Sequence, residues 1–533
     1  MIQYTDFFIE LQENPHKGVH LCYNIHWKVK IGGSAMRRLI DPEVMRVSEA
    51  EYFRASGVPS IEVMERAARA LSDAALERFP GAWSVHIACG PGGNGGDGYA
   101  CARLLRAAGR DVRVFAASPA KSPDAAANAA RARACGIPIL EAFDSDAVPD
   151  LWIDCLYGTG LSRAPHGAAA ELIARMNRDR AAGAKIAAAD IPSGLDGRTG
   201  ARFEPCIEAD LTVSFQYAKY GHVLQDGLDA CGELFVRDVG FPPEAFPADL
   251  PSLVEPRDLR SMFAPRRRNI HKGSCGHLLI VAGSAGMAGA AALCARAALR
   301  GGAGLVSIAC PGDIVPILQT LAPCAMCIPL PQRDGAIAPE AVETVCAALA
   351  GKTAVTIGPG LSRRAPAALV AAVLESGLPA AIDADALNLI AENPEQKALL
   401  RLHHILTPHP GEAARLLGRP CGDPVAGAEE LSSLGATAVL KGASRVIAGR
   451  SEIYVSASGA GGMARGGSGD VYAGLLGALL AEKSGRTPAQ SAAAACELHG
   501  LAGARAQAKY GPRGMNAADI IEFLPEVFRE YVD

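Results

Sequence analysis

Short apolar segments alternate with glycine-rich turns and apolar helices along most of the chain. In the first half, apolar residues 85–89 lead into a glycine-rich turn at 90–98, a predicted helix at 99–108 and a second apolar segment at 111–116. Strand, helix and strand in this order predict a parallel, doubly wound sheet. Residues 276–309 repeat the same order of elements, so we predict a second α/β sheet in the other half.

The same pattern predicts further elements in both halves. A long helical periodicity covers residues 48–78, where Val63, Ala67 and Leu71 mark one apolar face. The remaining apolar segments are read as strands, several of which end on polar residues: 151–154, 185–190, 211–215, 355–360, 380–385, 405–412 and 438–441. The fold class predicted for both halves is therefore α/β.

The chain length of 533 residues favours two domains, because one ordinary core does not grow to this size. A proline-rich junction at 241–251 is the best linker candidate and gives predicted domains at 36–245 and 255–533. Residues 1–35 show no clear hydrophobic period. We interpret them as a poorly specified extension, with Met36 as a more natural start.

Composition excludes several classes of function. Lys and Arg number 52 against 56 for Asp and Glu, so no basic excess favours a nucleic-acid or membrane partner. No apolar run is long enough to span a bilayer. The 15 scattered cysteines favour a reducing compartment, and we expect a cytoplasmic protein. Cys324 and Cys327 lie in the apolar run 321–330, which we interpret as a buried strand and not as a zinc or redox site.

Polar residues follow successive strands of the first half. Asp154 ends one apolar strand, Asp190 and Ser193 follow the next, and Asn94 lies in the first glycine-rich turn. The carboxyl ends of parallel strands converge on one crevice, so these side chains are expected to lie together. Their amide, hydroxyl and carboxylate oxygens suit K⁺ better than zinc. For each aspartate alone, capping of a loop is the alternative.

The spacing of Gly90, Gly92 and Gly95 also satisfies the dinucleotide fingerprint. A Rossmann dehydrogenase would carry an acidic residue at the end of the second strand to bind the ribose, and residues 115–118 contain no carboxylate. Ordinary NAD dehydrogenase chemistry is therefore not favoured.

Three motifs, at 90–98, 154–160 and 190–196, resemble the NAD(P)H-hydrate epimerase family (YjeF N-terminal domain) in content and order. The resemblance implies a Rossmann-like three-layer sandwich that inverts the hydroxylated carbon of hydrated NAD(P)H. It also implies that Asn94, Asp154 and Ser193 hold K⁺ and that Asp190 is the acid/base. The implied hydrate-binding residues include Asp190 and two loops, made of Gly93, Asn94, Gly95, Gly96 and Asp97, and of Gly158, Thr159, Gly160, Leu161, Ser162, Arg163 and Ala164.

This sequence departs from the family at Gly93, where a second asparagine is usual. Glycine preserves the turn but loses a side-chain hydrogen bond. Lys219 resembles another polar position of the family, with a role that the resemblance leaves open.

The second half is organised around a glycine-rich loop at 458–470 that leads into an apolar helix. The N–H groups of such a loop, together with the positive end of a helix, form an anion-binding site. Asp470 at the junction would repel an anion, but it is suited to accept a proton from a hydroxyl that attacks a phosphate. The alternative is a flexible loop with Asp470 as the helix N-cap. The Walker A motif is absent.

Five motifs of the second half, at 358–360, 383–388, 407–412, 441–442 and 462–470, resemble the ADP/ATP-dependent NAD(P)H-hydrate dehydratases of the ribokinase-like superfamily. The resemblance implies a ribokinase-like three-layer sandwich in which Asp470 is the base and contacts the hydrate. It implies a hydrate site that also contains Ala290, Gly360 and His409. It further implies a nucleotide site made of Lys441, Gly442, Ala443, Ser444, Arg445 and Gly469, and Mg²⁺ organised through Glu412.

The two resemblances together imply a bifunctional repair enzyme acting on NADHX and NADPHX, the hydrated forms of NADH and NADPH. It would epimerise the R and S forms and dehydrate the S epimer at the expense of ADP, giving AMP and phosphate. We expect a homo-oligomer, a tetramer or larger. Two alternatives stay open: a small-molecule kinase with an N-terminal nucleotide-binding module, and a non-enzymatic sensing or scaffold module in the first half.

Overall fold

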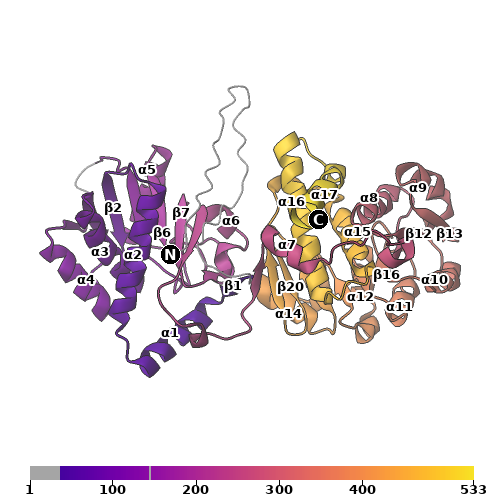
Figure 1. Ribbon diagram of the computed structural model, residues 1–533, viewed down its shortest axis with the longest axis horizontal. Helices are drawn as coiled ribbons and strands as arrows, with labels where there is room; N and C mark the ends of the chain where they lie inside the picture. The colour runs from indigo at the N-terminus through magenta and orange to yellow at the C-terminus, as the bar shows by residue number, and fades with distance from the viewer. Residues whose placement is uncertain (1–35, 143–145) are drawn as a thin grey trace.

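The computed structural model describes residues 36–142 and 146–533, so the extension predicted at 1–35 lies outside the described residues. Two lobes stand side by side, and each has a sheet with helices on both faces (Figure 1). This arrangement confirms the prediction of two α/β sandwiches. Of the described helices, none combines the length and apolar character needed to cross a bilayer.

Within the described residues, the sheet of the first lobe has seven strands, and every pair of neighbours is parallel. Its central strands are almost entirely buried, as expected for a parallel sheet with helices on both faces. In spatial order the strands are β4 (Ile139–Leu140), β3 (Asp111–Ala116), β2 (Ser84–Cys89), β5 (Leu151–Cys155), β6 (Lys185–Ala189), β7 (Leu211–Phe215) and β9 (Glu233–Arg237).

The helices of the first lobe form two layers. Helices α2, α3 and α4 share one apolar cluster with the sheet, and α5 shares another on the opposite face. On α5, the buried carboxylate of Asp179 accepts bonds from Arg175 Nε at 2.8 Å and Trp152 Nε1 at 3.0 Å. The helix bounds are α1 (Pro42–Ser56), α2 (Ser60–Arg78), α3 (Gly93–Ala107), α4 (Pro123–Ala134), α5 (Ala168–Ala181) and α6 (Gly227–Ala230).

Two predicted helix bounds are wrong. The helical pattern at 48–78 is two helices, because Gly57 ends α1 in the left-handed conformation and Pro59 precedes α2. Helix α3 begins at Gly93 and not at residue 99. A Cβ at Gly95 would lie 1.9 Å from the Gly90 carbonyl oxygen, so the glycines permit a close approach of helix to strand and do not mark a longer turn.

The sheet of the second lobe has twelve strands. In spatial order they are β13 (Met326–Leu330), β12 (Leu305–Pro311), β11 (His277–Val281), β16 (Ala354–Ile357), β17 (Ala380–Ile382), β18 (His404–Leu406), β19 (Thr437–Leu440), β20 (Arg445–Ala448), β21 (Ile453–Ser456), β10 (Ser252–Val254), β1 (Arg37–Ile40) and β8 (Ala218–Lys219). A separate hairpin joins β14 (Gln332–Arg333) to β15 (Ala336–Ile337). The run that contains Cys327 forms the edge strand β13, in which only Leu330 is buried, so the prediction of a buried strand is wrong.

The helices of the second lobe also form two layers. One cluster packs α10 to α14 on one face of the sheet, and two others pack α8, α9, α15, α16 and α17 on the opposite face. The bounds are α7 (Pro256–Met262), α8 (Ala288–Arg300), α9 (Val315–Leu321), α10 (Val342–Leu349), α11 (Ala368–Glu375), α12 (Asp385–Glu392), α13 (Pro410–Leu417), α14 (Pro424–Ser432), α15 (Ser468–Ala481), α16 (Pro488–Tyr510) and α17 (Ala517–Tyr531).

Two short strands from the first half complete the second sheet. Strand β1 pairs antiparallel with β10, and β8 pairs parallel with β1, with Lys219 opposite Ile40. Next along the chain, Val223 joins the core of the second lobe. A polar contact between the halves is the ion pair of Arg198 with Asp423, and Arg198 also pairs with Asp41 of its own half. The sheet of the second lobe therefore contains strands from both halves of the chain.

Candidate functional site

Asp190 lies directly after β6 in a strained backbone conformation. Its φ is 61°, in the left-handed region that non-glycine residues rarely adopt. Bonds on both sides hold it there, because its N–H donates to the Val213 carbonyl at 2.8 Å and its own carbonyl accepts from His222 Nε2 at 2.7 Å. Strain of this kind clusters at functional sites, where it aims a side chain.

A buried lysine orients the Asp190 carboxylate. Lys219 is 1% exposed, and its Nζ donates to Asp190 Oδ1 at 2.5 Å. The same Nζ donates to Ser214 Oγ at 3.1 Å and to the Phe215 carbonyl at 3.0 Å. These three acceptors satisfy all the donors of the ammonium group, so the lysine has one geometry and presents its charge to Asp190.

His222 supports the same arrangement. Its Nδ1 accepts from the Lys219 backbone N–H at 2.9 Å, so the proton sits on Nε2, which donates to the Asp190 carbonyl. Burial, together with the nearby Lys219 charge, lowers the pKa of His222 to about 4 and keeps the ring neutral. His222 therefore acts as a fixed bridge between Lys219 and the Asp190 backbone.

Two further acids share this electrostatic environment. Burial raises the pKa of Asp97 well above its ordinary value, and the charges of Asp190 and Glu49 raise it further. Burial raises the pKa of Glu49 to about 7, with Lys219 opposing the shift and Asp190 adding to it. The site thus combines an ion-paired carboxylate with two neighbouring acids whose pKa values are raised by burial.

The candidate cation ligands of the first lobe lie together. Asp154 Oδ1 accepts from Ser193 Oγ at 2.7 Å, and Asp154 Oδ2 accepts from the Ser193 N–H at 2.7 Å. Asn94 Nδ2 donates to the Tyr157 carbonyl at 2.8 Å, and the Tyr157 N–H donates to Ser193 Oγ at 2.9 Å. Asn94 Oδ1 is buried and has no hydrogen-bond partner within the described residues. An orphaned oxygen beside a carboxylate and a hydroxyl fits a K⁺ ligand set.

The other residues predicted to bind the hydrate surround these groups. Gly93, Asn94, Gly95, Gly96 and Asp97 form the first turn of α3, directly after β2. The loop of Gly158, Thr159, Gly160, Leu161, Ser162, Arg163 and Ala164 follows β5 and is mostly exposed. A Cβ at Gly158 would lie 3.6 Å from Asn94 Cβ, so this loop passes directly over the start of α3.

Asp470 of the second lobe lies in the first turn of α15, after the glycine-rich loop. Burial raises its pKa to about 7, the charges of Asp383 and Asp385 add to this shift, and Lys441 opposes it. A carboxylate with this pKa is close to ideal for a general base near neutral pH. The environment of Asp470 is therefore compatible with proton transfer near neutral pH.

A lysine and a second aspartate stand beside Asp470. Lys441 follows β19, and its Nζ donates to Asp383 Oδ1 at 2.6 Å, which also accepts from Thr407 Oγ1 at 2.7 Å. A Cβ at Gly469 would lie 3.6 Å from Lys441 Nζ and 3.7 Å from Asp383 Oδ2. Because residue 469 is a glycine, no side chain stands between its backbone and the Lys441–Asp383 ion pair. The prediction that Lys441 and Gly469 belong to one site fits this geometry.

The predicted hydrate-binding residues of the second lobe lie on neighbouring loops. Gly360 has φ of 60°, and a Cβ there would lie 3.0 Å from Ala290 Cβ. His409 is the N-cap of α13, where its Nδ1 accepts from the Gly411 N–H at 3.0 Å. Its backbone N–H donates to Glu412, a buried acid whose pKa is raised by burial and lowered by the Lys441 charge.

Two members of the predicted nucleotide set direct their side chains elsewhere. Gly442 and Ala443 form an exposed turn after Lys441, whereas Ser444 and Arg445 are buried. The Ser444 hydroxyl donates to the carbonyl of Val223, a residue from the first half of the chain, and Arg445 Nη1 donates to the Ser458 carbonyl. The side chains of Ser444 and Arg445 therefore hold neighbouring backbone segments in place.

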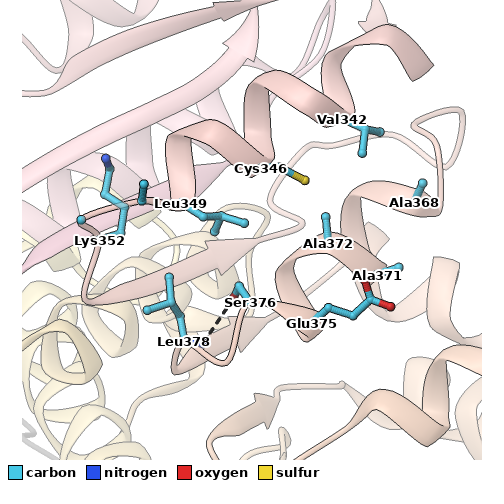
Figure 2. A pocket seen from close by; sticks show the side chains of 12 residues that line it. Val342, Cys346, Leu349, Lys352, Ala368, Ala371, Ala372, Glu375, Ser376 and Leu378 are labelled. Carbon is cyan, nitrogen blue, oxygen red and sulfur yellow. Dashed lines mark hydrogen bonds between the residues drawn. The ribbon is translucent and has the colours of Figure 1, made fainter.

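A surface groove lies away from both groups of residues. It has a volume of about 670 Å³ between α10 and α11, and its walls are mainly alanine and other apolar side chains (Figure 2). None of the predicted site residues lines it. Most of the predicted site residues lie instead in loops and first helical turns that follow strands, where open α/β sheets bind ligands.

Family models match the chain in both halves. The model described as YjeF-related protein N-terminus matches residues 60–221, and that of NAD(P)H-hydrate dehydratase matches residues 278–526. A curated relative from Coxiella burnetii, a bifunctional NAD(P)H-hydrate repair enzyme, is 37% identical over 88% of this chain and 95% of its own. The chain belongs to this family of bifunctional repair enzymes. The Escherichia coli relative of the same name is 36% identical, over 91% of this repair enzyme and 92% of its own chain.

Among solved structures, an ADP/ATP-dependent NAD(P)H-hydrate dehydratase from Bacillus subtilis, co-crystallised with ATP and Mg²⁺, is 27% identical to this repair enzyme. The alignment covers 52% of this repair enzyme and 97% of that chain, with a TM-score of 0.45.

Sequence reasoning assigned no role to several residues of this repair enzyme that the structure brings to the two sites. His222 and Glu49 surround Asp190, and Asp383 pairs with Lys441. Only Asp383 carried a signal, since it follows an apolar strand as the predicted aspartates do. Glu49 lies on an amphipathic helix among other charged residues, where nothing local distinguishes it.

Proposed function

We propose that this repair enzyme interconverts the R and S epimers of hydrated NADH and NADPH at Asp190 and dehydrates the S epimer at Asp470. The second reaction uses ADP and releases AMP and phosphate. One observation carries the proposal: in a chain whose halves match the two family models, each half has a carboxylate, Asp190 or Asp470, that interacts with the charge of a lysine. The two reactions complement each other, because the first supplies the epimer that the second consumes.

Inversion requires a proton donor and a proton acceptor. Loss of the hydroxyl gives a cation conjugated with the ring nitrogen, and water adds back to the other face. The departing oxygen takes a proton and the incoming water gives one up. Burial raises the pKa of Asp97, which suits this residue to donate a proton, and Asp190, ion-paired with Lys219, is suited to accept one.

Asn94, Asp154 and Ser193 would hold K⁺ in the epimerase half. This assignment rests on the buried Asn94 oxygen that lacks a partner among the described residues, next to the Asp154–Ser193 pair. The ion would supply positive charge beside the two loops that receive the substrate. For the dehydratase half, the carboxylate oxygens of Glu412 and Asp383 fit Mg²⁺, which would neutralise charge on the nucleotide phosphates.

Dehydration proceeds through a phosphorylated intermediate. Asp470 accepts the proton of the substrate hydroxyl as its oxygen attacks the terminal phosphorus of ADP, and the bond from phosphorus to the AMP oxygen breaks. Lys441 and the N–H groups of the glycine-rich loop hold the phosphate. Phosphate then leaves with the electrons of its carbon–oxygen bond, the neighbouring ring carbon gives up a proton to the departing phosphate or to water, and the electrons of that C–H bond form the double bond that restores NAD(P)H. Phosphorylation thereby turns a poor leaving group into a good one.

The test uses the full-length protein with each separated epimer, ADP or ATP, and with or without K⁺. Chromatography follows the epimers, absorbance follows the dihydronicotinamide, and AMP and phosphate are quantified. Asp190→Asn is expected to abolish epimerisation and to retain dehydration of the S epimer. Asp470→Asn is expected to abolish dehydration and to retain epimerisation. Hydrate that persists without phosphate release would refute the dehydratase proposal, and unchanged epimerisation by Asp190→Asn would remove Asp190 from the mechanism.

A further inference from the structure

One face of α16 lies against the glycine-rich loop that precedes Asp470. Glu497, Gly500, Gly503 and Gln507 recur every three or four residues, so they share one side of the helix. Each contacts the segment 456–463 (Figure 1 shows α16 beside α15). None of these four residues belongs to the sites described above.

The polar members of this face hold the loop by hydrogen bonds. Ser456 Oγ and Ser458 Oγ donate to the two carboxylate oxygens of Glu497, at 2.9 Å and 2.5 Å. One turn of 3₁₀ helix, η7 (Gly461–Met463), follows, and its Gly462 N–H donates to Gln507 Oε1 at 2.8 Å. The loop is therefore fixed to α16 at two separate places.

The glycines of the face allow the backbones to approach. A Cβ at Gly500 would lie 2.3 Å from the Ser458 carbonyl oxygen, and one at Gly503 would lie 2.1 Å from Met463 Sδ. The first of these contacts involves backbone, which must move if a side chain is added. Glycine inside a helix lowers helix stability, so its presence at these two positions serves the contact with the loop.

Glu497 is fully buried, and burial raises its pKa to about 7. A buried carboxylate is costly unless donors surround it. Besides the two serine hydroxyls, the charge of Arg445 favours its ionised form, and Arg445 Nη1 donates to the Ser458 carbonyl. Ser458 is therefore held from both sides at the start of the loop.

We propose that this face of α16 is the positioning surface of the phosphate-binding loop, with Glu497 as a positioning residue for the dehydratase reaction. The inference rests on the proposed function. A loop with glycines at 459, 461, 462, 466 and 467 loses much backbone entropy when it orders around an anion. Because α16 fixes the loop beforehand, its N–H groups are aimed at the nucleotide before binding, as preorganised donors require.

The main test is Gly500→Ala in the full-length protein. We expect the KM for ADP to rise about tenfold or more, because small displacements of binding groups are costly, while the KM for the hydrate changes by less than about twofold. The matched control is Gly312→Ala, since a Cβ at Gly312 meets no atom within 4 Å. Epimerase activity of the same chain reports whether the variant is folded. An unchanged KM for ADP in a variant with normal epimerase activity overturns the inference.

Glu497→Gln is a second variant that keeps the side-chain volume. Backbone amides of residues 459–467 are expected to exchange hydrogen at least about tenfold faster in it than in the wild type, with exchange in α17 unchanged. Equal protection of the loop in both proteins contradicts the inference. This measurement does not depend on turnover, so it distinguishes a wrong role for α16 from failure of the proposed dehydratase reaction, which would show as an inactive wild type.

Discussion

Replacing Asp383 by asparagine should shift the pH dependence of the dehydratase to lower pH. The negative charge of Asp383 raises the pKa of Asp470, and Lys441, which lowers it, is held on Asp383. Asp383→Asn removes the like charge and leaves the lysine free to approach Asp470. Both changes favour the ionised base, so its pKa falls from about 7.

The size of the shift follows from the geometry. Gly469, which precedes Asp470, is in contact range of Asp383. Two charges roughly 7 Å apart at an effective dielectric constant of about 20 interact by about 2 kcal/mol. Solvent access to Asp470 reduces this to about 1.4 kcal/mol, or about one pKa unit. At about pH 6 the ionised fraction of Asp470 then rises from about one tenth to about one half.

The assay is kcat/KM for ADP between about pH 5.5 and 8.5 with the S epimer saturating, which reports ionisations of the enzyme without nucleotide. Each profile is normalised to its own plateau, so a loss of absolute activity does not obscure the shift. Titration of ADP itself is common to both profiles. Relative activity at about pH 6 should be roughly fivefold higher in the variant. An unchanged midpoint would show that Asp470 is not the titrating base or that Asp383 does not act on it.

The remaining predictions concern the first lobe and the lobe boundary. Lys219→Met should lower epimerase kcat/KM by roughly 100-fold, because Asp190 loses its orienting charge, and dehydration of the S epimer should be retained. The control variant is Lys185→Met, at an exposed position. Equal epimerase rates in the two variants would contradict the orienting role of Lys219. Asp179→Ala should lower the free energy of unfolding by about 3–5 kcal/mol in denaturant titration, since a buried arginine loses its carboxylate; a loss under about 1 kcal/mol would refute this. Arg198→Ala should cost less than about 1 kcal/mol, because its ion pairs are partly exposed, and this cost should shrink in high salt; a larger, salt-independent loss would count against that reasoning.

Local sequence patterns were sufficient for most strands and for the main polar residues. Parallel strands buried on both faces are continuous apolar runs, so β3 and β7 match their predicted residues, and Asp190 and Asp470 follow where strands and loops were expected. The start of α3 was missed because glycine favours turns locally, and tertiary contact reverses this preference.

Other features depend on residues far apart in the sequence. The two-residue strand β8 is too short to show a period, and its pairing with β1 joins segments almost 180 residues apart. The acids around Asp190 come from separate helices, so only the fold reveals their shared electrostatics. The oligomeric state and the cytoplasmic location stay predictions from the sequence.

The twelve-stranded sheet, which contains strands from both halves, limits how the chain can be divided. Cutting at the proline-rich junction would separate β1 and β8 from β10, and each fragment would carry an open edge with unpaired N–H and C=O groups. Such edges promote aggregation, so separately expressed halves are expected to self-associate or to recombine with each other in trans. Lys219, which is ion-paired with Asp190, lies on β8, and the pairing of β8 with β1 continues into the sheet of the second lobe.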